Sequence, residues 1–92
     1  MNPAHKIDMY CVYIIRSKIN KTLYSGATSN FKERLLEHNT GRVFSTKTKR
    51  PFEPIYCEFY KDKRDAFHRE KMLKYKGQGL RRLKERLFYS LS

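Results

Sequence analysis

A continuous β-prone run near the start of the chain places the strongest constraint on the fold. Residues 10–15 spell YCVYII, without the alternation of polar and apolar residues that a half-exposed strand shows. A run of this kind is typical of a strand that is covered on both faces of its sheet. The chain has 92 residues, which is enough for one compact domain and not for two.

The rest of the pattern consists of short strands and amphipathic helices. A polar connection at 18–21 leads into a second strand that Gly26 is expected to end, which predicts a hairpin. A polar loop closed by Pro51 and Pro54 precedes the third strand. The expected elements are strands at 10–15, 22–25 and 55–60 and helices at 31–38, 63–76 and from about residue 80 onward. This ββαβαα order predicts one α+β domain over residues 10–88, between tails at 1–9 and 89–92.

The charge of the chain indicates a polyanionic partner. Lysine and arginine number 21 against 9 acidic residues, and the formal net charge is +12. Such an excess repels itself and destabilises the compact state, whereas counterion release from nucleic-acid phosphates favours binding. Solubility alone requires much less charge. A membrane surface is the other polyanion that attracts cations.

No targeting or membrane segment is evident in the sequence. Residues 1–8 lack the apolar core of a signal peptide, and the longest apolar run, 9–15, is far too short to span a bilayer. Cys11 and Cys57 lie in strand-like runs without CxxC spacing, so we expect buried thiols rather than a disulfide or a metal site. We therefore expect a cytoplasmic protein without a membrane partner.

The first predicted helix carries two candidates for chemistry. Arg34 and His38 lie four residues apart and border the apolar face of this helix. A cation and an imidazole therefore stand together at the edge of a buried surface. The simpler interpretation is an arginine paired with Glu33 or Glu37 on a solvated helix face, and the spacing by itself favours it.

The second predicted helix has a carboxylate on its apolar face. Glu70 falls within the arc marked by Ala66, Phe67 and Leu73. A carboxylate in such a setting must be paired, protonated or bound to a metal. The spacing fits two roles equally well. One is a salt bridge to a lysine or arginine, and the other is a ligand of Mg²⁺, which often takes one or two carboxylates together with phosphate oxygens.

Two strand tyrosines form a third group. Tyr13 lies in the first strand and Tyr24 in the second, so a hairpin brings them near each other across the sheet. Ordinary strand packing is the simpler explanation for both. A phenol with a pKa near ~10 is a poor base unless a cation such as Arg34, or a metal ion, lowers that pKa. Gly26 indicates either a close backbone approach or merely the end of the strand.

These candidates belong to short motifs that follow one another in a fixed order. The motifs are Cys11-Val12-Tyr13, Tyr24-Ser25-Gly26, the helix with Arg34 and His38, the segment Glu37-His38-Asn39-Thr40-Gly41, and His68-Arg69-Glu70-Lys71. The ordered set, spread over residues 10–87, resembles the GIY-YIG nuclease domain, and most closely its small stand-alone bacterial members of uncharacterised function. Cys11 replaces the motif's glycine, Ser25 replaces its isoleucine, and no asparagine follows Asn39.

The resemblance implies a fold, a reaction and a set of roles. The fold is a small three-stranded, mostly antiparallel sheet flanked by helices, and the reaction is phosphodiester hydrolysis with one Mg²⁺ or Mn²⁺ ion held by Glu70. Tyr13 would act as general base on the attacking water with Tyr24 bonded in the same site, although either tyrosine fits the role of base. Arg34 would neutralise charge on the pentacovalent phosphorane, and His38 would orient the water or assist Tyr13.

Basic residues outside this set are expected to contact nucleic-acid phosphates, namely Lys47, Lys49, Arg50, Lys71 and Lys74. Such contacts position a nucleic acid without reading its sequence. We therefore expect structure-directed or weakly specific cutting of DNA, in preference to RNA, in DNA repair or recombination and without a small-molecule cofactor. The alternative is a non-catalytic basic module that binds DNA or RNA. A domain that docks an acidic protein explains neither Glu70 nor the paired tyrosines.

Overall fold

The computed structural model describes residues 9–92, so the N-terminal tail expected at 1–9 lies outside the described residues except for Met9. The elements are β1 (Tyr10–Ser17), β2 (Leu23–Thr28), α1 (Phe31–Asn39), the 3-10 turn η1 (Lys47–Lys49), β3 (Phe52–Tyr60), α2 (Lys63–Lys74), the 3-10 turn η2 (Tyr75–Gly77) and α3 (Gln78–Arg86). This is the ββαβαα order of an α+β fold, and it confirms the class expected from the sequence.

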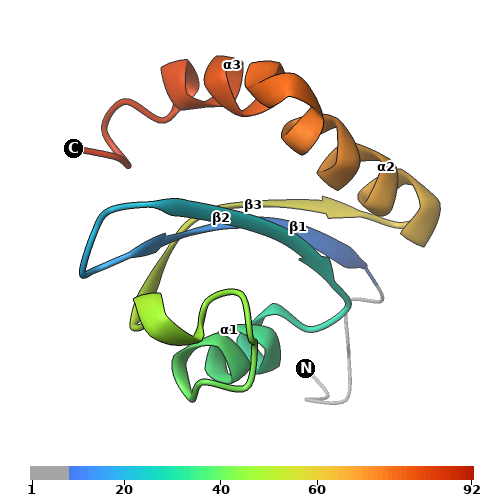
Figure 1. Ribbon diagram of the computed structural model, residues 1–92. Helices are drawn as coiled ribbons and strands as arrows, with labels where there is room; N and C mark the ends of the chain where they lie inside the picture. Colours follow the sequence, from blue (N-terminus) through green and yellow to red (C-terminus); the bar gives the residue numbers. More distant parts are fainter. Residues whose placement is uncertain (1–8) are drawn as a thin grey trace, which may run out of the picture.

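The strands form one antiparallel sheet in the order β2-β1-β3. Figure 1 shows α2 and α3 on one face of this sheet and α1 on the other. Because β1 is the central strand and both of its faces are covered, all residues of its apolar run from Cys11 to Ile15 are buried. The layered arrangement explains why that segment lacks polar alternation.

Alternate residues of β1 belong to two separate hydrophobic clusters. Val12 and Ile14 pack beneath the two C-terminal helices, against Ala66, Leu73, Leu83 and Leu87. Cys11, Tyr13 and Ile15 pack on the α1 side with Phe52, and with the half-buried side chains of Tyr24, Phe31, Leu35 and Cys57. The side chain of Tyr13 therefore lies between the sheet and α1, which is the layer that holds the candidate site.

Three expectations for individual residues are wrong. Gly26 does not end the second strand but lies inside β2, opposite Tyr13. Pro54 does not close a loop but lies within β3, where the pairing with β1 shifts register between Ile14 and Ile15. A proline is tolerated there because β3 is an edge strand and the irregular pairing requires no amide hydrogen from it. Phe67, expected on the inward face of α2, has 45% of its surface exposed.

A carboxylate on β3 fixes α2 against the sheet. Glu58 accepts two hydrogen bonds from Arg69, at 2.9 and 2.8 Å, and one each from Tyr56 and Tyr60. Burial alone would raise the pKa of Glu58, but the hydrogen bonds from these three partners lower it to about 2. The carboxylate is therefore ionised at neutral pH, and its oxygens are fully used in holding the helix that also carries Glu70.

The two cysteines are free thiols, with Cys11 buried and Cys57 half-buried. A hydrogen bond with Cys57, together with burial, raises the pKa of Cys11. Among the described residues, no helix is long and apolar enough to cross a membrane.

Candidate active site

A chain of buried polar groups runs from β1 through α1 into the following loop. The Tyr13 hydroxyl lies 2.9 Å from Nε2 of His38, and Nδ1 of His38 lies 2.7 Å from Oγ1 of Thr46. All three residues are at most 1% exposed. The Thr46 hydroxyl donates to the Val43 carbonyl at 3.4 Å. On the basis of that contact we assign the ring proton of His38 to Nδ1, so that Nδ1–H donates to Thr46 and Nε2 accepts from Tyr13.

The surroundings of His38 keep its imidazole neutral. Burial lowers the pKa of His38 from its usual 6.5, and the positive charge of Arg34 lowers it further, while Glu37 opposes the change. Burial raises the pKa of Tyr13, although the neighbouring Arg34 guanidinium partly offsets that rise. At neutral pH the pair is therefore an un-ionised phenol that donates to an un-ionised imidazole, and Nε2 is able to take up a proton.

Local structure explains why His38 is held so firmly. The helix α1 begins at the side chain of Asn30, which accepts from the Glu33 amide at 3.1 Å. At the other end, the side-chain amide of Asn39 bonds both the N–H and the carbonyl of Phe52, at 2.7 and 3.1 Å. These contacts tie the last turn of α1 to the start of β3, and His38 is the one residue of α1 that is fully buried.

Tyr24 joins the same cluster from β2. In the register of the sheet, Tyr24 pairs with Ile15, and Tyr13 pairs with Gly26, so the two tyrosines are diagonal neighbours on one face. The ring of Tyr24 lies 5.2 Å from the ring of His38, edge to face. Ser45 donates to the Tyr24 hydroxyl at 3.4 Å. The approach of the two tyrosines expected from the hairpin is thus present, with the imidazole packed against both.

Arg34 lies on α1 beside Tyr13. Its guanidinium forms an ion pair with Glu37 at 2.8 Å, as the simpler interpretation of the sequence expects, and about a third of its side chain is exposed. Contact with Glu37, and then with Tyr13, raises the pKa of Arg34. Arg34 therefore remains a cation, and it lines a small surface hollow at the start of α1 together with Glu33 and Glu37.

Glu70 is connected to this cluster through a lysine. Its carboxylate forms an ion pair with Lys74 one turn along α2, and only 18% of its side chain is exposed. The Lys74 ammonium in turn lies 5.6 Å from the centre of the Tyr24 ring. The structure thus brings Tyr13, Tyr24, Arg34 and His38 into one cluster, and it places Glu70 next to that cluster with Lys74 between.

One carboxylate is compatible with Mg²⁺ or Mn²⁺ only if other ligands arrive with the substrate. Among the described residues, no three potential ligand side chains gather around a common point. A hard divalent cation commonly takes one or two carboxylates and completes its shell with water and phosphate oxygens. Glu70 fits that pattern, because its present partner is the ammonium of a half-exposed lysine with a long, flexible side chain.

Gly26 is required by the position of Tyr13. A Cβ atom built on Gly26 would lie 2.3 Å from the Tyr13 hydroxyl oxygen and 2.5 Å from the ring carbon that carries it. The ring is 1% exposed and lies in the buried cluster between the sheet and α1, where close packing resists its displacement. The glycine of the second motif is therefore explained by close approach rather than by termination of the strand.

We expect Gly26→Ala to destabilise the fold by about 1–3 kcal/mol, because the added methyl group overpacks a buried site. Urea unfolding measures this loss. In a Tyr13→Phe background the penalty should be smaller, since the nearest clashing atom is gone. An equal penalty in both backgrounds would contradict the close-approach explanation.

The expected phosphate contacts lie in two groups. Lys47, Lys49 and Arg50 are exposed on and just after η1, in the loop that also supplies Thr46. Lys71 and Lys74 are exposed on α2, where Lys74 is paired with Glu70. Both groups thus belong to segments that contribute residues to the site.

Sequence reasoning missed Thr46 and Ser45. They lie in an irregular polar loop, where neither helical nor strand periodicity marks a residue as buried. Only the folding of that loop against α1 and β2 reveals that the Thr46 hydroxyl holds the far side of the imidazole. The signal that the sequence offers is a Ser-Thr pair in the loop that follows the helix carrying His38.

Comparison with known proteins places this geometry in context. The family model described as the GIY-YIG catalytic domain matches residues 9–84, which include every candidate residue above.

Bacterial relatives share most of the chain. A UPF0213 protein of Staphylococcus haemolyticus is 38% identical over 78 residues, which cover 82% of this chain and 94% of the relative. A UPF0213 protein of Clostridium perfringens is 37% identical, over 72% of this chain and 71% of its own. A UPF0213 protein of Syntrophus aciditrophicus is also 37% identical, over 68% of this chain and 74% of the relative.

Proposed function

Because this chain belongs to the GIY-YIG catalytic domain family, we propose that it is a metal-dependent endonuclease that cleaves DNA of particular structure with little sequence preference. The observation that carries the proposal is the buried bond between the Tyr13 hydroxyl and a neutral His38, with the Arg34 cation alongside. A domain that only binds nucleic acid has no need for a phenol and an imidazole aligned in this way. DNA repair or recombination is the physiological setting we propose, in the cytoplasm.

Tyr13 is the proposed general base. Its own proton is directed to His38, so the remaining lone pairs of its oxygen face away from the imidazole. A water molecule that attacks the phosphorus gives its proton to this oxygen while the phenol proton passes to Nε2 of His38. The relay needs no phenolate in the resting enzyme, which agrees with the raised pKa of Tyr13.

Arg34 and Glu70 are the residues proposed to stabilise the charge on the reacting phosphate. The Arg34 guanidinium is the permanent cation beside the base, and it stabilises the extra negative charge of the pentacovalent transition state. Glu70 would hold the divalent ion, and that ion, when bound, supplies Lewis-acid stabilisation of the leaving oxygen. With the ion held by Glu70, Lys74 would be available to contact the DNA backbone, as we also propose for Lys47, Lys49, Arg50 and Lys71.

The competing function is a basic module that binds DNA or RNA without cutting it. The net charge of +12 favours binding and does not by itself require catalysis. The two functions share a salt-sensitive affinity and differ in whether the strand is broken.

A panel of labelled substrates separates these functions. Branched DNA, duplex DNA, single-stranded DNA and RNA of one sequence are incubated with the protein in Mg²⁺, in Mn²⁺ and in EDTA. We expect binding to all four with affinity that falls steeply as salt rises, and cleavage of branched DNA only with a divalent ion. Binding without cleavage in any arm would favour the basic module.

A further inference from the structure

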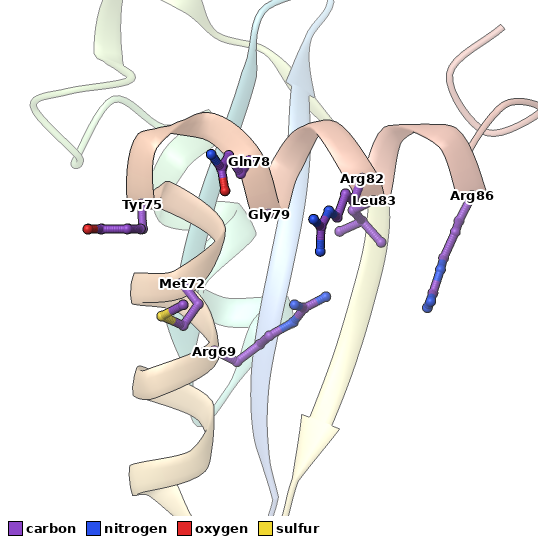
Figure 2. A pocket seen from close by; sticks show the side chains of 8 residues that line it. All are labelled: Arg69, Met72, Tyr75, Gln78, Gly79, Arg82, Leu83 and Arg86. Atoms are coloured by element: carbon purple, nitrogen blue, oxygen red, sulfur yellow. The ribbon is translucent and has the colours of Figure 1, made fainter.

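A hollow lined by three arginines lies in the angle between α2 and α3, away from the tyrosine–histidine cluster. Its volume is about 350 Å³, and its lining includes Arg69, Arg82 and Arg86 together with Met72 and Tyr75. Figure 2 shows Arg69 and Arg82 pointing into the angle between the helices, Arg86 at the far end of α3, Met72 on the last turn of α2, and the side chain of Tyr75 extending outward from the turn.

Two glycines set the shape of this hollow. Gly77 adopts a left-handed conformation, with φ of 69°, at the turn that redirects the chain from α2 into α3. A Cβ on Gly79 would lie 2.7 Å from the Met72 carbonyl oxygen, so the lack of a side chain lets α3 cross closely over the end of α2. The angle between the helices is therefore built into the fold before any ligand binds.

The arginines of the hollow outnumber the available carboxylates. Arg69 is paired with Glu58, whose oxygens are already saturated by four hydrogen bonds. Within residues 9–92, no carboxylate lies at ion-pair distance from Arg82 or Arg86, and the lining of the hollow contains no acidic side chain. Like charges one helical turn apart repel each other. An anion of the phosphate class would pair with both Arg82 and Arg86.

The extent and the apolar end of the hollow indicate more than a single phosphate ion. From Gln78 to Arg86, α3 extends roughly 12 Å at 1.5 Å per residue, which exceeds the reach of one phosphate group. At the other end, 55% of Tyr75 and 44% of Met72 are exposed. An exposed aromatic ring beside a basic groove is the arrangement on which unpaired bases stack, whereas the bases of a duplex are already stacked within it.

We propose that the hollow binds an unpaired strand of nucleic acid, with backbone phosphates at Arg82 and Arg86 and a base against Tyr75. This inference rests on the proposed function for the class of ligand, and it specifies which substrates the enzyme prefers. Arg69 points toward Glu58 of β3, whereas Glu70 on the same helix points toward Lys74 and Tyr24, so the hollow holds a part of the strand that is distant from the bond to be cut. Branched DNA with an unpaired arm is therefore preferred over a continuous duplex.

The test is fluorescence anisotropy with a labelled single-stranded oligonucleotide and a duplex of the same sequence, in EDTA so that neither is cut. The double variant Arg82→Ala/Arg86→Ala is compared with Arg81→Ala/Lys84→Ala, which removes two exposed cations from the same helix outside the hollow. We expect single-strand affinity to fall about tenfold in the first variant and about twofold in the second, with duplex affinity reduced similarly in both.

Tyr75 provides an independent arm of the test. Tyr75→Ala should weaken single-strand binding about tenfold and leave duplex binding unchanged, whereas Tyr75→Phe, which keeps the ring, should bind both like the parent. Melting curves confirm that each variant is folded.

Two outcomes would overturn the proposal. One is equal loss of single-strand affinity in both double variants. The other is stabilisation of the parent by inorganic phosphate through Arg82 and Arg86 while strand affinity is unaffected, which would make the hollow a site for small phosphates. Either result leaves the nuclease proposal standing if the parent still cuts branched DNA. If the parent protein neither binds nor cuts nucleic acid, the single-strand site and the nuclease proposal are both wrong.

Discussion

Glu70→Gln is expected to abolish metal-dependent cleavage while leaving the protein folded and able to bind DNA. The substitution keeps the shape of the side chain and removes the charge that a divalent ion requires. Its structural cost is the ion pair with Lys74, a lysine that is 53% exposed, and such pairs contribute only about 0.5 kcal/mol. We therefore expect the melting temperature to fall by about 4 °C at most, and cleavage of a labelled branched DNA in Mn²⁺ to be undetectable.

Glu85→Gln is the matched control. It removes the same charge from an exposed position on α3, outside the candidate site. It should melt and cut like the parent. A Glu70→Gln protein that melts far lower would identify the carboxylate as structural, and one that cuts as fast as the parent would remove Glu70 from the reaction.

Tyr13→Phe is expected to reduce the cleavage rate by about 10²- to 10⁴-fold, the usual contribution of a positioned general base. The ring still fills its place beneath α1, but the oxygen that would take the water proton is lost. The change also removes the donor to Nε2 of His38, which is 0% exposed. An unsatisfied buried acceptor costs about 1–3 kcal/mol, so a modest loss of stability accompanies the loss of rate. Single-turnover cleavage and urea unfolding measure the two effects separately.

Tyr24→Phe distinguishes the two phenols. The Tyr24 hydroxyl has only a long contact from Ser45, at 3.4 Å, and it donates to no described imidazole. We therefore expect a rate loss much smaller than that of Tyr13→Phe. The reverse order of effects would assign the role of base to Tyr24. It would also mean that the hydrogen bond between Tyr13 and His38 takes no part in proton transfer.

The sequence predicts the order of elements and the layer in which the tyrosines lie. The uninterrupted apolar run of β1 indicates a strand covered on both faces, and the spacing of Arg34 and His38 places them on one side of α1. These features are local, because they depend on periodicity within a single element. The motif residues are recognisable from the amino-acid sequence for the same reason, since each motif lies within one short segment.

Features that depend on contacts between elements are not predictable in this way. The bond from His38 to Thr46 joins a helix to an irregular loop, and Glu58 gathers its partners from β3 and α2. The spacing of Glu70 fits a salt bridge and a metal ligand equally well, and its ion pair with Lys74 supports the first role in the free protein. Gly26 illustrates the general reason: its role is defined by Tyr13 on the neighbouring strand, and no pattern within β2 contains that information.

The most direct test of the central claim is cleavage of one labelled branched DNA by the parent protein in Mn²⁺ and in EDTA, with Glu70→Gln protein purified in the same way. The parallel sample is essential because a trace of contaminating nuclease would be present in both preparations. We expect the parent to cut in Mn²⁺ and not in EDTA, and the Glu70→Gln protein to cut in neither. Equal cleavage by the two proteins, or no cleavage by the parent with any divalent ion, would contradict the account.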